Sequence, residues 1–430
     1  MSSLRGLVAD VRPLRNGHFR RLWIAQIITM VGAQLTVVAV PAQLYADTGN
    51  SAYVGLAGFF GLVPLIVFGL YGGALVDHFD RRLMLVITTL GLIGTSALFW
   101  AQAGMGNTNP WLLLTLFAVQ QAFFAVNSPA RSAILPSLLP NEQLPAANSL
   151  SMTVFQAGAI AGPLLAGVLI PFTGYTWLYL IDTFTLFATL YAVVLLPRLA
   201  VVGASAGVRA PGLRSVWEGF AYARTKPVLL MSFVVDLIAM VFGMPRALYP
   251  EIAHQTFGGP ADGGVVLALL FAAIPAGSVI GGIFSGWLSH VERQGYVVLW
   301  CISVWGLGIL GFGVTLWLAP HAMTLMLVLG LFFQVVAGAG DVASAAIRSS
   351  ILQEAADDNV RGRLQGVFTV VVAGGPRLAD VLHGGIAVAA GTAATTAGGG
   401  ALVMVGIVAV AMLVPAFVRY KVVRRVAAVV

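Results

Sequence analysis

Three ionisable residues are spaced three positions apart in an otherwise apolar stretch: Arg377, Asp380 and His383. Residues three or four apart lie on one face of a helix, so these side chains can form a single polar stripe. A carboxylate beside an arginine and a histidine could take up and release a proton. The arginine and the aspartate could equally form a static ion pair, and the sequence leaves both interpretations open.

Other ionisable residues interrupt apolar stretches elsewhere in the chain. Asp236 lies in the middle of one and could serve proton coupling or substrate binding. Arg246 could attract an anionic substrate or anchor a helix at the membrane surface, and Asp341 could take part in gating or be solvated at a helix end. Such groups cost about 2.5–3.5 kcal/mol near the centre of a span, which makes them functional candidates. For Asp182 we expect a structural role.

The elements that position these residues are apolar helices. Hydrophobic residues make up 59% of the chain and charged residues 9%, and the mean hydropathy is +0.93. These values indicate an integral membrane protein. A helical crossing needs about 20 apolar residues, and the sequence holds twelve such windows, centred near residues 34, 64, 94, 120, 160, 187, 238, 275, 308, 333, 376 and 408. We therefore predict an all-α membrane protein with twelve transmembrane helices.

The basic residues indicate how the chain crosses the membrane. All but two of the 23 lysines and arginines lie at the termini or in the even-numbered loops, the exceptions being Arg246 and Arg377. Because short cytoplasmic loops retain basic residues, both termini should be cytoplasmic in a multi-pass protein of the cell membrane. We expect no removable signal peptide. The net charge of +7 thus reflects topology and contact with anionic lipid rather than nucleic-acid binding.

The chain reads as two parallel six-helix repeats. Three segments of the first half match segments about 215 residues further on: "GALVDHFDRR" and "GWLSHVERQG", "ARSAIL" and "IRSSIL", "VFQAGAIAGPLLAG" and "VFTVVVAGGPRLAD". Between the halves lies the longest polar stretch. We predict a six-helix bundle at 1–197, a cytoplasmic linker with an amphipathic segment at 198–226, and a second bundle at 227–430.

One loop carries a motif that resembles a family signature. "GALVDHFDRR" resembles the loop 2–3 signature of the major facilitator superfamily, G-x-x-x-D-x-x-G-R-R/K, with Asp80 in place of the expected second glycine. The matching residues are Gly73, Asp77, Arg81 and Arg82. The resemblance implies a cytoplasmic latch in which Asp77 faces the positive N-terminal end of helix eleven, with Arg131 as a further partner. The alternative is a solvated loop that obeys the positive-inside rule.

A second motif lies on the fifth predicted helix. "SLSMTVFQAGAIAGPLLAG" resembles the antiporter motif of facilitator exporters, and the matching residues are Gly158, Gly162, Pro163 and Gly167. Small residues let helix backbones approach closely. The motif favours export, although such faces also pack helices in other membrane proteins.

Longer stretches resemble the enterobactin exporter branch of the superfamily and related macrolide efflux proteins. They are "PRALYPEIA", "GRLQGVFT" and "SPARSAILPSLLPNEQLPAANSL". The resemblance implies a secondary active exporter of a siderophore or similar secreted metabolite, working by alternating access and coupled to protons. The alternatives are a multidrug or macrolide efflux pump on the same scaffold, or a transport-inactive scaffold or sensor.

The sequence also limits the chemistry. Lys226 and Lys421 are the only lysines and neither follows a glycine, so no Walker A phosphate loop is present, and there is no H-E-x-x-H pattern. We therefore predict neither an enzyme nor a metal or organic cofactor. The expected partners are a small-molecule substrate, protons and the lipid bilayer, and the expected state is a monomer.

Overall fold

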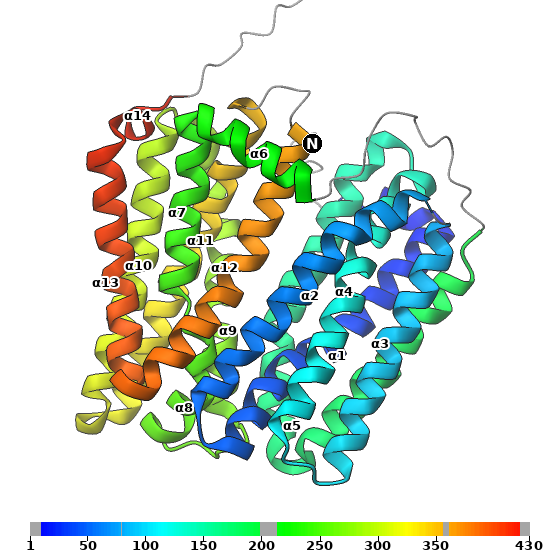
Figure 1. Cartoon of the computed structure of the whole chain (residues 1–430), viewed down its shortest axis with the longest axis horizontal. Coiled ribbons are helices and arrows are strands. Elements are labelled where there is room, and N and C mark those ends of the chain that lie inside the picture. The colour runs from blue at the N-terminus through cyan, green and yellow to red at the C-terminus, as the bar shows by residue number, and fades with distance from the viewer. Residues whose placement is uncertain (1–9, 79, 198–212, 356–360, 422–430) are drawn as a thin grey trace, which may run out of the picture. The chain divides into compact units, whose positions relative to one another are not determined.

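The computed structural model describes residues 10–78, 80–197, 213–355 and 361–421. These residues form helices and turns, and no strand occurs among them (Figure 1). The helices are α1 (Gly17–Thr48), α2 (Ser51–His78), α3 (Arg81–Gly104), α4 (Pro110–Leu138), α5 (Leu144–Val194), α6 (Leu213–Thr225), α7 (Pro227–Gly243), α8 (Tyr249–Glu251), α9 (Val265–Ile283), α10 (Gln294–Leu318), α11 (Met323–Ala355), α12 (Arg361–Ala390), α13 (Thr392–Leu413) and α14 (Pro415–Val418).

The predicted all-helical membrane architecture is confirmed. Ten helices in the described part of the chain are long and apolar enough to cross a membrane. One of them, α5, changes direction at Gly174, whose φ of 67° suits glycine, so it contains both the fifth and the sixth predicted spans. The eleventh predicted span corresponds to α12, which is not one of the ten and carries Arg377 and Asp380.

Local sequence signals explain where the first helices begin and end. The Asn16 side chain accepts hydrogen bonds from the backbone N–H groups of His18 and Phe19, at 3.0 and 3.1 Å, and so caps α1. The helix ends at Gly49, which adopts the left-handed conformation (φ 64°) typical of helix ends. At the start of α4, Asn109 caps the helix and Pro110 occupies the first helical position, where it loses no hydrogen bond.

Contacts between residues divide the chain into two compact units. Unit 1 comprises Met1–Gly212 and Ala247–Ala272, and unit 2 comprises Leu213–Arg246 and Ala273–Val430. In unit 1, α5 packs against α1 and α3, and α4 packs against α2 and α3 (Figure 1). In unit 2, α10 packs against α11 and α13, and α7 packs against α12 and α13. The predicted linear division into two bundles and a linker stays a prediction.

The short segment Ala247–Ala272 is tied to unit 1 by polar contacts. Ser51 Oγ donates to Glu251 Oε2, Gln255 Nε2 donates to Tyr45 Oη at 2.8 Å, and Tyr175 Oη donates to the Asp262 carbonyl at 2.7 Å. These bonds explain why a segment that follows α7 belongs to the unit built from α1 to α5.

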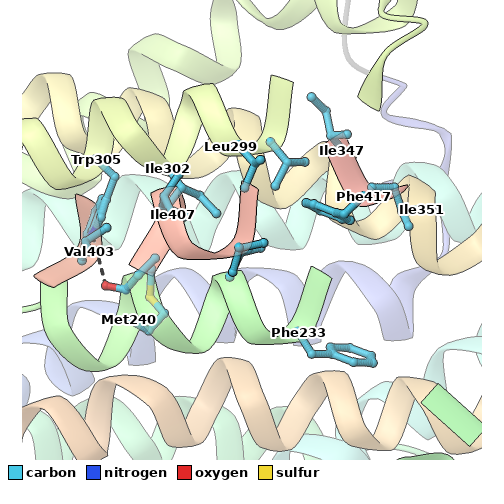
Figure 2. Close-up of a cluster of buried hydrophobic side chains, with 14 of the residues drawn as sticks. Phe233, Met240, Leu299, Ile302, Trp305, Ile347, Ile351, Val403, Ile407 and Phe417 are labelled. Carbon is cyan, nitrogen blue, oxygen red and sulfur yellow. Dashed lines mark hydrogen bonds between the residues drawn. The ribbon is translucent and has the colours of Figure 1, made fainter. Parts of the chain in front are cut away.

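The core of unit 2 brings α7, α10 and α13 together around Trp305 (Figure 2). Trp305 is 1% exposed, and its Nε1 donates to the Ala239 carbonyl at 3.1 Å. Helix α6 adds Ala223 to the same core and exposes 70% of Trp217. Close packing and buried hydrogen bonds hold helices together in a bilayer, so this core fixes the positions of the polar residues on α7.

Candidate functional site

Two carboxylates and one arginine meet inside unit 2. Asp236 on α7 is 2% exposed and pairs through Oδ1 with Arg348 Nη1. Arg348, on α11, is 4% exposed, and its Nη2 lies 3.8 Å from Asp341 Oδ1. Its Nε donates to Ser344 Oγ at 3.1 Å. We call Asp236, Arg348 and Asp341 the α7/α11 triplet.

Helical spacing explains how the triplet assembles. Asp341, Ser344 and Arg348 follow one another at intervals of three and four residues, so they lie on one face of α11. That face meets Asp236 on α7, whose helix contacts α11. One carboxylate oxygen, Asp236 Oδ2, is buried without a hydrogen-bond partner among the described residues.

A second polar cluster joins the end of α7 to α12. Arg246, in the turn η3 (Arg246–Leu248), donates through Nη2 to Asp380 Oδ2 at 2.6 Å. Asp380 is 5% exposed, whereas 28% of the Arg246 side chain is exposed. Arg377 is half-buried and lies within electrostatic range of both residues. We call Arg246, Arg377 and Asp380 the α12 cluster.

The predicted polar stripe on α12 is therefore divided among different neighbours. The structure pairs Asp380 with Arg246, a residue distant in sequence, rather than leaving it only with Arg377. His383 is 2% exposed, and its Nε2 lies 3.0 Å from the Phe242 carbonyl on α7. Phe242 lies at the end of α7 and Arg246 just beyond it in η3, and sequence spacing on α12 reveals neither partner.

Arg348 is the residue of this site that the sequence reasoning missed. Its position in the sequence predicts a cytoplasmic loop, but it lies on α11 and is buried against Asp236. The repeat contains the signal that could have found it, because "IRSSIL" places Arg348 opposite Arg131 in "ARSAIL". Arg131 was already among the candidates.

The loop motif is partly described. The surroundings of Gly73 and the side chain of Asp77, near the end of α2, lie outside the described residues. Asp80 caps α3 by accepting from the N–H of Arg82 at 2.8 Å, and its φ of −54° lies outside the region that favours glycine. This explains how aspartate can replace the glycine of the family signature.

The arginines of the loop motif bind carbonyls of neighbouring helices. Arg81 Nη1 donates to the Ala133 carbonyl at 2.8 Å, and Arg82 Nη2 donates to the Val194 carbonyl at 2.6 Å. The Val194 carbonyl lies at the C-terminal end of α5, where cations are favourable. Arg131 Nη2 donates at 3.1 Å to the Leu22 carbonyl and at 3.1 Å to Gln26 Oε1 on α1.

The glycines of the antiporter-like motif lie where α5 meets close neighbours. A Cβ at Gly158 would overlap the Met30 side chain, and one at Gly162 would overlap that of Gln34, both on α1. A Cβ at Gly167 would overlap Ala268 and the Gly264 carbonyl. The neighbouring Pro163 is buried. The motif therefore allows tight packing within unit 1.

The profile of the Major Facilitator Superfamily matches residues 22–379. The match runs from α1 into α12 and contains the whole α7/α11 triplet. The chain belongs to the major facilitator superfamily. Its fold and family make it a non-enzymatic, multi-pass transporter of small molecules in the inner membrane.

The transporter is similar to curated exporters along nearly its whole length. It is 26% identical over 400 residues to the enterobactin exporter EntS of Shigella boydii serotype 18, covering 92% of each chain. It is 27% identical over 397 residues to the enterobactin exporter EntS of Citrobacter koseri, covering 92% of this chain and 91% of that one.

Solved structures share the fold of the transporter. A variant of the nucleoside transporter NupG has a TM-score of 0.76 at 11% identity, covering 92% of this chain and 100% of that one. A bacterial homologue of the iron transporter ferroportin in an inward-facing state has a TM-score of 0.64 at 15% identity, covering 91% and 97%.

The two clusters of unit 2 are the chemically distinctive part of the transporter. Removing one partner from a buried ion pair costs about 3–5 kcal/mol because the other charge remains in an apolar setting. Ionisable side chains that the protein keeps despite this cost are candidates for binding an ion or an anionic substrate. Among the described residues, no group of three or more histidines, cysteines or acids could hold a metal ion.

Proposed function

We propose that the transporter exports a siderophore or a similar secreted metabolite by alternating access, driven by proton entry. The likeness to enterobactin exporters over 92% of both chains supports this proposal. The antiporter-like motif of α5, with its close packing at Gly158 and Gly162, also favours export. Alternating access would expose a substrate site to the two sides of the membrane in turn, with 1–197 and 227–430 as the two bundles of the transporter.

The observation that carries the substrate class is the α12 cluster. The Arg246 guanidinium is partly exposed while its partner Asp380 is nearly buried, and Arg377 lies close to both. A guanidinium binds paired oxygen anions through parallel hydrogen bonds. A catecholate siderophore presents such oxygens, so it can replace Asp380 at Arg246 when it binds, and Asp380 neutralises Arg246 when it leaves.

Other residues support the transport cycle. The carboxylates Asp236, Asp341 and Asp380 are the candidates for proton coupling, and His383 sits one turn beyond Asp380. In line with the loop signature that it matches, Asp77 favours the state with a closed cytoplasmic side. Both termini are cytoplasmic, and the transporter works as a monomer.

The test is mass spectrometry of the siderophore inside and outside iron-starved cells of the source organism. The strains lack the gene or carry the wild type, Arg246→Gln or Arg293→Gln. Arg293 is an exposed loop arginine and serves as the matched control. We expect the siderophore to accumulate inside the deletion strain and the Arg246→Gln strain, and to be cleared in the other two.

An unchanged siderophore balance in the deletion strain would reject this substrate. The drug susceptibility of the same strains would then test an efflux pump on the same scaffold. Clearance by Arg246→Gln at the wild-type rate would instead retain the exporter and reject the α12 cluster as its substrate site.

A further inference from the structure

The α7/α11 triplet contains one more acid than base. Asp236 and Asp341 are both close to Arg348, and the charges that act on Asp341 are those of Arg348 and Asp236. With both carboxyl groups ionised the triplet carries a net charge of −1. In an apolar setting a surplus charge is strongly unfavourable, and one added proton removes it.

The surrounding helices offer few charges that could balance the surplus. Helix α13 carries no ionisable residue and α10 carries only Tyr296 and Cys301. The described acids and bases on the other packed elements are Glu218, Tyr222 and Arg224 on α6, Arg377, Asp380 and His383 on α12, His290 on the turn η5 (Ser285–His290) and His321 on the turn η6 (Ala319–His321). Among the described side chains, the charges that act on Asp341 are those of Arg348 and Asp236, so the described charge balance of the triplet comes from its own members.

We propose that Asp236 and Asp341 share one exchangeable proton around Arg348, and that this proton drives the export cycle. The role of this proton in driving export rests on the proposed function, whereas its location rests on the geometry of the triplet. Asp236 Oδ2 is buried without a hydrogen-bond partner among the described residues, so it has an oxygen free to accept a proton. Asp341, with 30% of its side chain exposed, is where the proton enters and leaves.

The exchange needs only a proton and a change of partner. When Asp341 is protonated, Arg348 pairs with the Asp236 carboxylate, which is the pairing in the structure. When the proton passes from the Asp341 carboxyl to Asp236, the Asp341 carboxylate becomes the partner of Arg348. The guanidinium keeps its charge throughout, and its Nε remains held by Ser344 Oγ at 3.1 Å.

Infrared spectroscopy of the purified full-length transporter tests the shared proton directly. A protonated carboxyl group has a stretching band that an ionised one lacks. The triplet should give such a band in the wild type, and both Asp341→Asn and Asp236→Asn should lose it, because the single carboxylate left in either variant is fully balanced by Arg348. Asp182→Asn, which alters a buried carboxyl of unit 1, is the matched control and should keep this band.

Asp341→Asn is the decisive variant because it leaves the buried pair of Asp236 and Arg348 intact. A folded Asp341→Asn protein that retains the whole band would overturn the proposal. So would a wild-type band that responds to sodium chloride but not to pH, since the site would then bind a metal cation.

A transport measurement separates this inference from the proposed function. In proteoliposomes, Asp341→Asn should still exchange labelled enterobactin across the membrane without a pH gradient. Accumulation driven by a pH gradient should fall about 5- to 150-fold, the range of coupling between linked sites. Wild-type protein that moves no enterobactin would reject the substrate while the infrared result still decides the proton site. Unchanged pH-driven accumulation in Asp341→Asn would reject the proton site and retain the exporter.

Discussion

The two units place an arginine at matching positions and give it different partners. Arg131 and Arg348 occupy the same place in the repeated hexapeptide, and Gln26 and Asp236 each lie nine residues after the first residue of their helix, α1 or α7. In unit 1 the arginine donates to Gln26 Oε1 and a backbone carbonyl. In unit 2 it pairs with the Asp236 carboxylate.

The same contrast extends to the buried carboxyl groups. Asp182 in unit 1 is 2% exposed and accepts from two hydroxyl groups, Thr36 Oγ1 and Ser96 Oγ, both at 2.9 Å. Asp236 in unit 2 is equally buried but has a cation as its partner. One scaffold therefore serves fixed hydrogen bonds in unit 1 and ion pairs in unit 2.

The largest expected difference concerns the two arginines. Arg348→Gln leaves Asp236 as a buried carboxylate without its cation, which should lower stability by about 3–5 kcal/mol. Arg131→Gln removes donors from neutral acceptors, which should cost only about 1–3 kcal/mol. Thermal unfolding of the purified variants in detergent measures both.

Adding Asp236→Asn to Arg348→Gln should recover much of the lost stability, because no charge then remains buried in the pair. Equal melting temperatures for Arg348→Gln and Arg131→Gln would contradict the proposed difference between the two units.

The hydroxyl-bound carboxyl of unit 1 should behave as a structural group. Asp182→Ala leaves Thr36 and Ser96 without their acceptor and should destabilise the protein by about 1–3 kcal/mol. Asp182→Asn keeps an acceptor oxygen and should be milder. We expect the Asp182→Asn variant to retain pH-driven transport, and a loss as large as that in Asp341→Asn would place a second proton site in unit 1.

The smallest expected effect comes from turning the hydrogen-bonded pair of Gln26 and Arg131 in unit 1 into an ion pair like that of unit 2. Gln26→Glu has nearly the same shape and gives Arg131 a carboxylate at a position now 3.1 Å away. The charged hydrogen bond to Arg131 stabilises the protein, but glutamate cannot donate to the Ser151 carbonyl as Gln26 Nε2 does at 3.3 Å, so the net gain should be below about 1 kcal/mol. Gln26→Leu, which offers no acceptor, is the control and should lower the melting temperature. A melting temperature that falls with Gln26→Glu would show that unit 1 excludes a charge at this place.

The fold could be predicted from the sequence because hydropathy and helix length suffice to find membrane spans. Each predicted centre falls within a helix, and Gly174 explains why two spans share α5. The grouping of Ala247–Ala272 with unit 1 could not be foreseen, since it depends on bonds such as Gln255 to Tyr45 that join residues far apart in the chain.

The sequence could predict which residues form the candidate site, but not which of them pair with one another. Asp236, Asp341 and Asp380 stand out as acids in apolar stretches, but nothing in their spacing shows which arginine meets them. Arg348 looks like a loop residue by position, and only its contact with α7 shows its burial. Asp80 departs from the signature in sequence, and only its hydrogen bonds show that it acts as a helix cap.

Proton movement driven by enterobactin tests the central claim most directly. Purified wild-type transporter would be sealed into liposomes with a pH-sensitive dye inside, and enterobactin would be added outside without a pH gradient. We predict that enterobactin entry drives protons the other way, out of the liposomes, that Asp341→Asn abolishes this movement, and that Asp182→Asn retains it. Enterobactin uptake without proton movement in the wild type, or equal movement in all three proteins, would contradict proton-coupled export through unit 2.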